Sequence, residues 1–134
     1  MIKSKSLECV LSCMSEREIQ PTDHSVAQER IKANLLENTL DLEREADRLG
    51  AMGEPTRFTI LYLLAEEGQL QSGELADLLE RRQNDLYHHL NTLEDAGLVG
   101  KFREGGQRVY ELSPLAEGFV PHIFDAVSAR AEAV

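Results

Sequence analysis

Apolar residues recur at intervals of three and four along most of this chain, which is the period of helices with one buried side. The pattern predicts helices over residues 7–18, from Asp23 or Ser25 to about 52, and over 56–66, 72–80, 84–96 and 113–130. Pro55 and Pro114 stand where helices are expected to begin, while Gly68 and Gly97 stand where they are expected to end. The chain is therefore predicted to be mainly α-helical.

The pattern changes only between residues 98 and 112, where two short strands are expected. Residues 98–103 and 107–112 flank Glu104, Gly105 and Gly106, a sequence suited to a tight hairpin turn. Two short helices separated by a polar break at residues 81–83 precede this hairpin. That order predicts an α+β fold, a winged helix-turn-helix, whose second helix enters the major groove of DNA.

The second of these helices has two chemically different sides. Leu86, Leu90 and Leu93 share the side expected to face the core. The opposite side carries amide and imidazole groups that can read base edges, and the hairpin adds cations for phosphates or the minor groove. An ordinary solvated polar face is the alternative. The predicted DNA-binding residues are Arg81, Arg82, Gln83, Asn84, Tyr87, His88, Asn91, Lys101, Arg103 and Arg108.

Charge is distributed unevenly along the 134 residues, whose formal net charge is -10. Residues 81–108 carry five basic and four acidic side chains, so the predicted DNA-binding segment is the least acidic part of the chain. Four lysines stand against 24 acidic residues. Such a surface is typical either of a protein working in concentrated salt or of an ordinary acidic cytosolic protein.

Other function classes find little support in the sequence. No apolar run reaches the length of a membrane span, and Glu8 and Glu16 interrupt any signal-peptide core, so a cytoplasmic protein is expected. Residues spaced as a catalytic constellation are not found, and an enzyme is not expected. We expect an N-terminal helical extension over residues 1–22 and one winged-helix domain over 23–134.

The predicted helix over 23–52 carries a long apolar stripe that includes Ile31, Leu35, Leu42, Ala46 and Leu49. A helix of this length ahead of a compact domain cannot bury its whole stripe within one chain. The final helix also keeps an apolar side, with Val120, Ile123, Phe124 and Val127. Part of these two helices is therefore predicted to form a dimer interface.

Four segments together resemble a known family. They read LGAMGEPTRFTIL at 49–61, ELA at 74–76, YHHLNTLEDAGLV at 87–99 and GQRVY at 106–110. They are similar to the ArsR/SmtB family of arsenic- and metal-responsive repressors, over roughly residues 44–111. The resemblance implies a homodimer formed by the first and last helices, a double-stranded DNA operator, and repression relieved when an effector binds.

The sensing sites of that family transfer poorly to this chain. Its Cys-x-Cys pair before the recognition helix corresponds to residues 70–73, which contain no sulfur. Its metal site on the last helices corresponds here only to His122 and Asp125.

Cys9 and Cys13 are the remaining candidates for an effector site. On a helix their spacing of four places the Cβ atoms about 6 Å apart, which suits a soft ion such as arsenite, cadmium or zinc. Further ligands would have to come from a second subunit or from a histidine such as His24. Redox sensing and inert thiols are the alternatives.

The sequence predicts a DNA-binding transcriptional regulator, a homodimeric repressor released by an effector. A winged-helix regulator without a small effector remains an alternative. So does a protein-interaction module that has lost DNA binding, because the chain is acidic.

Overall fold

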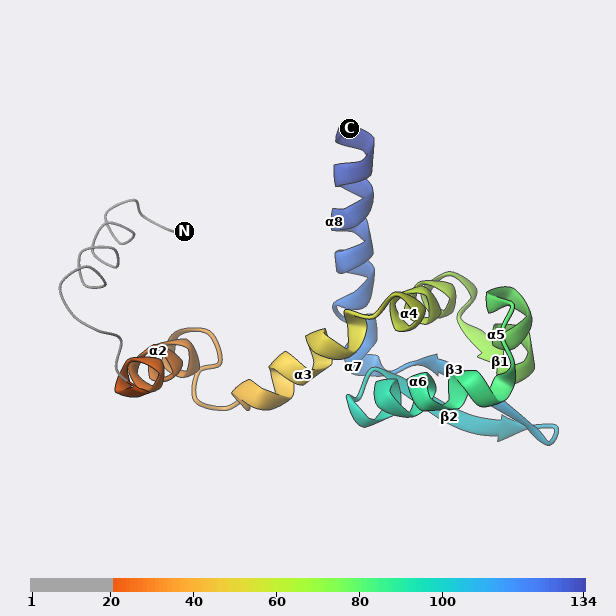
Figure 1. The fold of residues 1–134 in the computed structure, drawn as a ribbon, viewed down its shortest axis with the longest axis horizontal. Helices are drawn as coiled ribbons and strands as arrows, with labels where there is room; N and C mark the ends of the chain where they lie inside the picture. The colour runs from red at the N-terminus through yellow and green to blue at the C-terminus, as the bar shows by residue number, and fades with distance from the viewer. Residues whose placement is uncertain (1–20) are drawn as a thin grey trace. The chain divides into compact units, whose positions relative to one another are not determined.

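The computed structural model describes the backbone of residues 21–134 and the side chains from residue 26 onward. Cys9, Cys13 and the helix predicted over residues 7–18 lie outside the described residues. Contacts divide the chain into two units, Met1–Leu42 and Glu43–Val134 (Figure 1). The domain boundary predicted between residues 22 and 23 stays a prediction.

The single helix predicted from about residue 23 to 52 is wrong. Helix α2 (Pro21–Asn34) ends well before α3 (Leu42–Met52) begins. Between them Glu37 and Asn38 adopt positive φ angles of 53° and 58°, and the Asn38 amide donates to the Lys32 carbonyl at 2.8 Å. Asparagine tolerates the left-handed conformation better than most residues, which explains why the helix ends here despite its apolar spacing.

Helix α4 (Pro55–Glu67), predicted over residues 56–66, is the central element of the second unit. The Glu54 carboxylate caps its first turn by accepting from the Arg57 amide at 2.9 Å, and Pro55 fits the first helical position. Gly68 closes it with a φ of 88°. Ile60, Leu61 and Leu64 are at most 1% exposed, and the other buried residues of this core come from α3 and from the elements that follow α4, as far as Val120.

Helices α5 (Ser72–Leu79) and α6 (Gln83–Asp95) form the predicted helix-turn-helix. Glu80 ends α5 in the left-handed conformation, with a φ of 55°. The spacing of Leu75, Leu78 and Leu79 predicts that all three face the core. Leu75 is buried, but the prediction is wrong for Leu78, because 54% of its surface is exposed. The buried side of this short helix follows Ser72, Leu75 and Ala76, and Leu78 lies beyond its edge.

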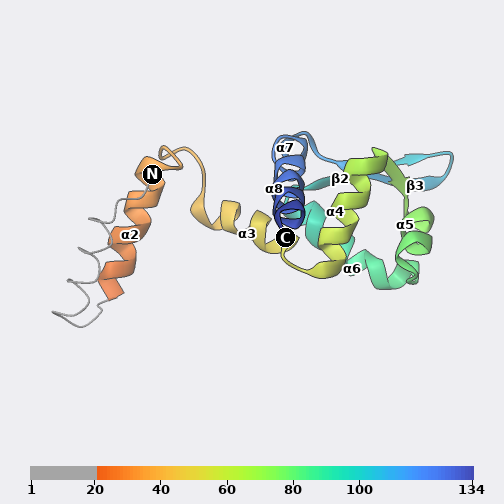
Figure 2. The same ribbon diagram turned by 90° about the horizontal axis from the view of Figure 1, so that it is seen from above.

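The hairpin is confirmed as β2 (Val99–Glu104) and β3 (Gln107–Leu112), paired antiparallel with Arg103 opposite Arg108. Gly105 and Gly106 form its turn with positive φ angles of 58° and 80°, which glycine adopts without strain. A third strand, β1 (Gln69–Gln71), pairs with β3 and was not predicted, because three residues are too short to show an alternation. The strand order is β1-β3-β2, and the hairpin extends past the helices (Figure 2).

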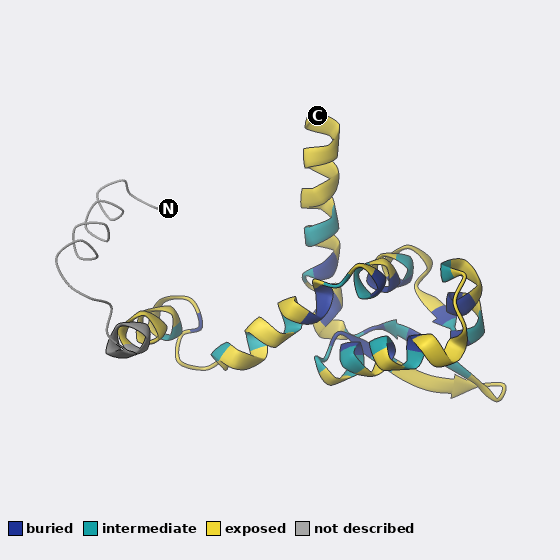
Figure 3. Cartoon of the chain, in the orientation of Figure 1, coloured by how far each residue is buried: buried dark blue, intermediate teal, exposed yellow. Residues whose placement is uncertain are grey.

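The last predicted helix is also interrupted. Residues 113–130 form α7 (Pro114–Glu117) and α8 (Val120–Ala133) instead of one helix. Pro121 accounts for the break, because a proline inside a continuous helix lacks an amide donor and collides with the preceding turn. The chain therefore restarts with Pro121 in the first turn of α8, whose last two turns are exposed (Figure 3). Within residues 21–134, no helix combines the length and apolar character that crossing a membrane requires.

Candidate nucleic-acid interface

Helix α6 presents one side to the core and the other to solvent. Leu86, Leu90 and Leu93 are between 0 and 1% exposed, as their spacing predicted. Asn84, His88, Asn91 and Asp95 on the opposite side are all exposed. The amide and imidazole groups that were predicted to read base edges are therefore accessible to a partner.

The first turn of α6 is attached to the first turn of α5. Arg81 and Arg82 precede it and are exposed, and Gln83 accepts a hydrogen bond from Ser72 Oγ at 3.3 Å through its Oε1. Ser72 is itself buried. Gln83 thus has a positioning contact that sequence spacing did not indicate, while its side chain remains exposed.

Two of the three hairpin cations contact α6. The Arg108 guanidinium lies 5.2 Å from the centre of the Tyr87 ring, within the range of a cation–π interaction. Lys101 Nζ lies 3.3 Å from Glu94 Oε1. Arg103 is different, because it is exposed and donates to the Gly106 carbonyl at 3.2 Å across the hairpin turn. These contacts hold the wing beside α6, whereas the Arg103 side chain is directed along the hairpin turn.

Two arginines hold α6 from its other flank. Arg57 Nη1 lies 3.2 Å from His89 Nδ1, while Arg57 Nε donates to the Ala51 carbonyl at 2.7 Å. Arg48 Nη1 donates to the Ala96 carbonyl at 2.8 Å, just beyond the end of α6. Sequence reasoning missed these contacts. The one available signal was His89, which sits a residue away from the exposed side of the helix.

The contact with Arg57 defines the protonation state of His89. An arginine can only donate, so His89 Nδ1 must be the acceptor and the ring must be neutral. Burial lowers the pKa of His89, and the Arg57 charge lowers it further, whereas Glu54 opposes this at 3.8 Å. The charges of His88 and Arg81 also lower it. The hydrogen bond from the Arg57 amide lowers the pKa of Glu54.

Comparison with known proteins agrees with this arrangement. Residues 52–99 match the model of a helix-turn-helix domain family. An uncharacterized HTH-type transcriptional regulator of Methanocaldococcus jannaschii is 41% identical over 68 residues, which cover 51% of this chain and 76% of that protein. The chain belongs to the ArsR/SmtB family of winged helix-turn-helix transcriptional regulators.

Two further proteins support the ArsR/SmtB assignment. The arsenical resistance operon repressor of Bacillus subtilis is 29% identical over 72 residues, covering 54% of this chain and 69% of that protein. The structure of HlyU from Vibrio cholerae superposes with a TM-score of 0.58 at 29% identity, covering 63% of this chain and 91% of that one.

Metal ligands on the last helix are a feature of the ArsR/SmtB resemblance, and His122 and Asp125 are the predicted ligands in this chain. His122 and Asp125 are exposed on α8. Over the part of the chain that the structure describes, no group of three or more histidine, cysteine, aspartate or glutamate side chains is placed to hold a metal ion. Their role as ligands stays a prediction, as does that of Cys9 and Cys13.

The first testable prediction concerns His89. Because its pKa is lowered in the folded state, the unfolded chain binds more protons as pH falls below about 6.5, and stability should fall with it. His89→Gln keeps an acceptor for Arg57 but cannot titrate, so its stability should vary less between about pH 7 and 5. Urea denaturation across this range measures the difference.

His88→Gln is the matched control, since His88 is exposed on the same helix. It should retain the pH dependence of the parent. Equal pH dependence of the parent and His89→Gln would contradict a neutral His89.

Proposed function

We propose that this protein is a homodimeric transcriptional repressor that places α6 in the major groove of a double-stranded DNA operator. The observation that carries the proposal is the exposed polar side of α6 next to a hairpin with Arg103 near its tip. Helices of this kind read bases with residues near their N-termini, which here are Asn84 and His88. The hairpin is suited to the phosphates or the minor groove beside that site.

The charge distribution supports specific rather than general attraction to DNA. Phosphate contacts supply most of the non-specific affinity of DNA-binding proteins, and a net charge of -10 opposes that attraction. Lys101 is also partly neutralised by Glu94. Base contacts from α6 should therefore account for a large share of the binding. The low lysine content favours a cytoplasm of high salt as the working environment.

The proposed dimer uses the apolar surface of the second unit. Leu49, Tyr62 and Val127 expose 56%, 44% and 42% of their surfaces. The Phe124 ring packs edge-on against Phe58 and Tyr62, at centroid distances of 5.0 and 5.4 Å. An apolar groove of about 500 Å³ adjoins them, with Leu49, Met52, Phe58 and Ile123 in its walls. Since α8 continues past this cluster with its surface exposed, a second copy would bury it.

The proposed effector is a thiophilic metal ion or arsenite held by Cys9 and Cys13. The relative from Bacillus subtilis is named for arsenical resistance, which supports this choice of chemistry. Two thiolates bind soft ions well, and a site in the N-terminal extension would act on the dimer rather than block the groove.

The second prediction tests DNA recognition. His88→Ala should weaken discrimination among bases by about 1–3 kcal/mol, because it removes a group at the base edges. Arg103→Ala should weaken binding to DNA of every sequence by a similar factor, and should lower the salt dependence of binding by about one counterion. Sites selected from a random duplex library provide the ligand, and titrations at several salt concentrations provide the affinities.

Arg30→Ala is the control, because this exposed arginine lies on α2, in the other unit of the chain. It should leave both quantities unchanged. If the parent protein enriches no duplex from the library, the DNA-binding proposal is wrong and a protein partner for α6 is favoured.

The third prediction tests the dimer. Val127→Asp should produce a monomer, since it places a charge on the apolar side of α8, whereas Ala129→Asp on the opposite side should not. Sedimentation of both variants gives their masses. An unchanged mass for Val127→Asp would exclude this interface.

The fourth prediction tests the thiols. Replacing both Cys9 and Cys13 by serine should remove release from DNA by arsenite, cadmium and zinc without changing affinity in their absence. A response equal to that of the parent would show that the pair is not the sensor, and His122 with Asp125 would become the next candidates.

A further inference from the structure

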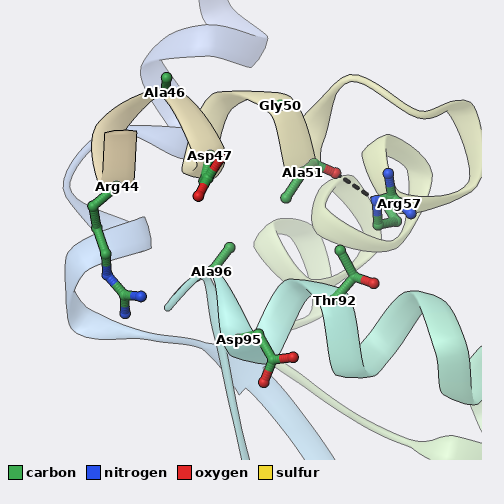
Figure 4. Close-up of a pocket in the computed structure, with 9 residues that line it drawn as sticks. All are labelled: Arg44, Ala46, Asp47, Gly50, Ala51, Arg57, Thr92, Asp95 and Ala96. Carbon is green, nitrogen blue, oxygen red and sulfur yellow. Dashed lines mark hydrogen bonds between the residues drawn. The ribbon is translucent and has the colours of Figure 1, made fainter. Parts of the chain in front are cut away.

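A second cavity of the DNA-binding unit lies away from the apolar surface. It has a volume of about 410 Å³ and opens between α3, α4 and α6. Its walls include Arg44 and Asp47 of α3, Arg57 of α4, and Thr92 and Asp95 of α6 (Figure 4). Its size lies in the range of small-molecule sites.

Asp47, Asp95 and Arg57 line this cavity without a hydrogen bond or ion pair to one another. Asp47 and Asp95 make no hydrogen bond or ion pair with any other described residue. Arg57 donates hydrogen bonds from Nε and Nη1 to two neutral acceptors, the Ala51 carbonyl and His89. Its Nη2 donors have no partner among the described residues. Thr92 donates to the His88 carbonyl at 3.0 Å and keeps its oxygen lone pairs as acceptors. The cavity therefore offers separate places for an anionic and a cationic group.

Gly50 is the glycine in the wall of this cavity. It lies inside α3, where glycine is less favourable than alanine. No positive φ requires glycine at this position, and a Cβ atom there would meet no other atom within 4 Å. Neither backbone conformation nor packing therefore requires glycine here, so a larger side chain can be placed in the cavity wall without disturbing the fold.

We propose that this cavity binds a small zwitterion of the α-amino acid type. A ligand carboxylate would face Arg57, and a ligand ammonium group would face Asp47 and Asp95. A ligand with a single charge would leave one set of these groups without a counterpart, so both charges are needed for tight binding.

The cavity also adjoins a contact that positions the recognition helix. Arg57 lines its wall and holds His89 of α6 at 3.2 Å. A carboxylate on Arg57 competes for the same guanidinium, so binding changes how α6 is held and thereby its affinity for DNA. This regulatory step rests on the proposed function, whereas ligand binding itself does not. The site is also separate from the proposed thiol site.

Calorimetry on the full chain without DNA tests the binding. The probes are the twenty common amino acids, with acetate and ethylammonium as single-charge controls. At least one amino acid should bind at least tenfold more tightly than either control. Asp47→Asn and Asp95→Asn should each weaken it at least tenfold, whereas Asp77→Asn, an exposed aspartate on α5, should not.

The variant Gly50→Leu fills the cavity with a side chain, and it distinguishes a blocked cavity from an unfolded protein as the cause of lost binding. It should abolish binding while the thermal unfolding midpoint stays equal to or above that of the parent. Absence of binding by all twenty amino acids, equal binding of a single-charge control, or retained binding in Gly50→Leu would each overturn the site.

The regulatory step has its own measurement. The bound amino acid should change affinity for the selected duplex at least threefold in the parent but not in Gly50→Leu. If an amino acid binds without changing the affinity for DNA, the proposed coupling to DNA binding is wrong, whereas the proposed binding site stands. If the parent selects no duplex at all, the proposed function fails, and the calorimetric result still decides the site.

Discussion

The division of α6 into a leucine side and a polar side is the constraint on which the rest of the interface depends. A rotation of the helix by one residue, 100°, would turn His89 or Asn91 toward the core in place of Leu90, with Leu86 displaced in the same way. Burying an amide or imidazole without partners costs free energy, and exposing two leucines adds to that cost. The buried leucine contacts, which involve no partner molecule, thus fix the orientation of the polar groups.

Polar contacts then restrain the same helix along its two flanks. On one flank Lys101 and Arg108 of the hairpin meet Glu94 and Tyr87. On the other, Arg57 reaches His89 from α4. An exposed ion pair such as that of Lys101 with Glu94 is individually weak, so its effect is on the orientation of the helix more than on its stability. The cost is that cations which could meet phosphate are shared with the protein itself.

The sequence was most informative where apolar spacing and helix-ending residues agreed. Helices α4 and α6 and the hairpin were predicted to within one or two residues, because Pro55, Gly68 and the Gly105-Gly106 pair fix their ends. Spacing alone failed over 23–52, where apolar periodicity ran through two residues with positive φ, and over 113–130, where Pro121 was overlooked.

For the candidate site, helical geometry predicted the exposed side of α6 correctly. It could not predict the contact between Arg57 and His89, because that pair is 32 residues apart and depends on how two helices cross. The cavity beside Arg57 was equally invisible in the sequence. It arises from the tertiary arrangement of three helices whose individual patterns give no sign of it.

The central place of β3 has a mechanical consequence. It pairs with β1, which leads directly into α5, and with β2, which follows α6, so hydrogen-bonded strands close the helix-turn-helix and the hairpin into one loop. A displacement of the wing is transmitted to the start of α5 rather than absorbed by a joint. Any adaptation to DNA of different half-site spacing therefore has to take place outside this closed loop, in the segments that lead into it and out of it.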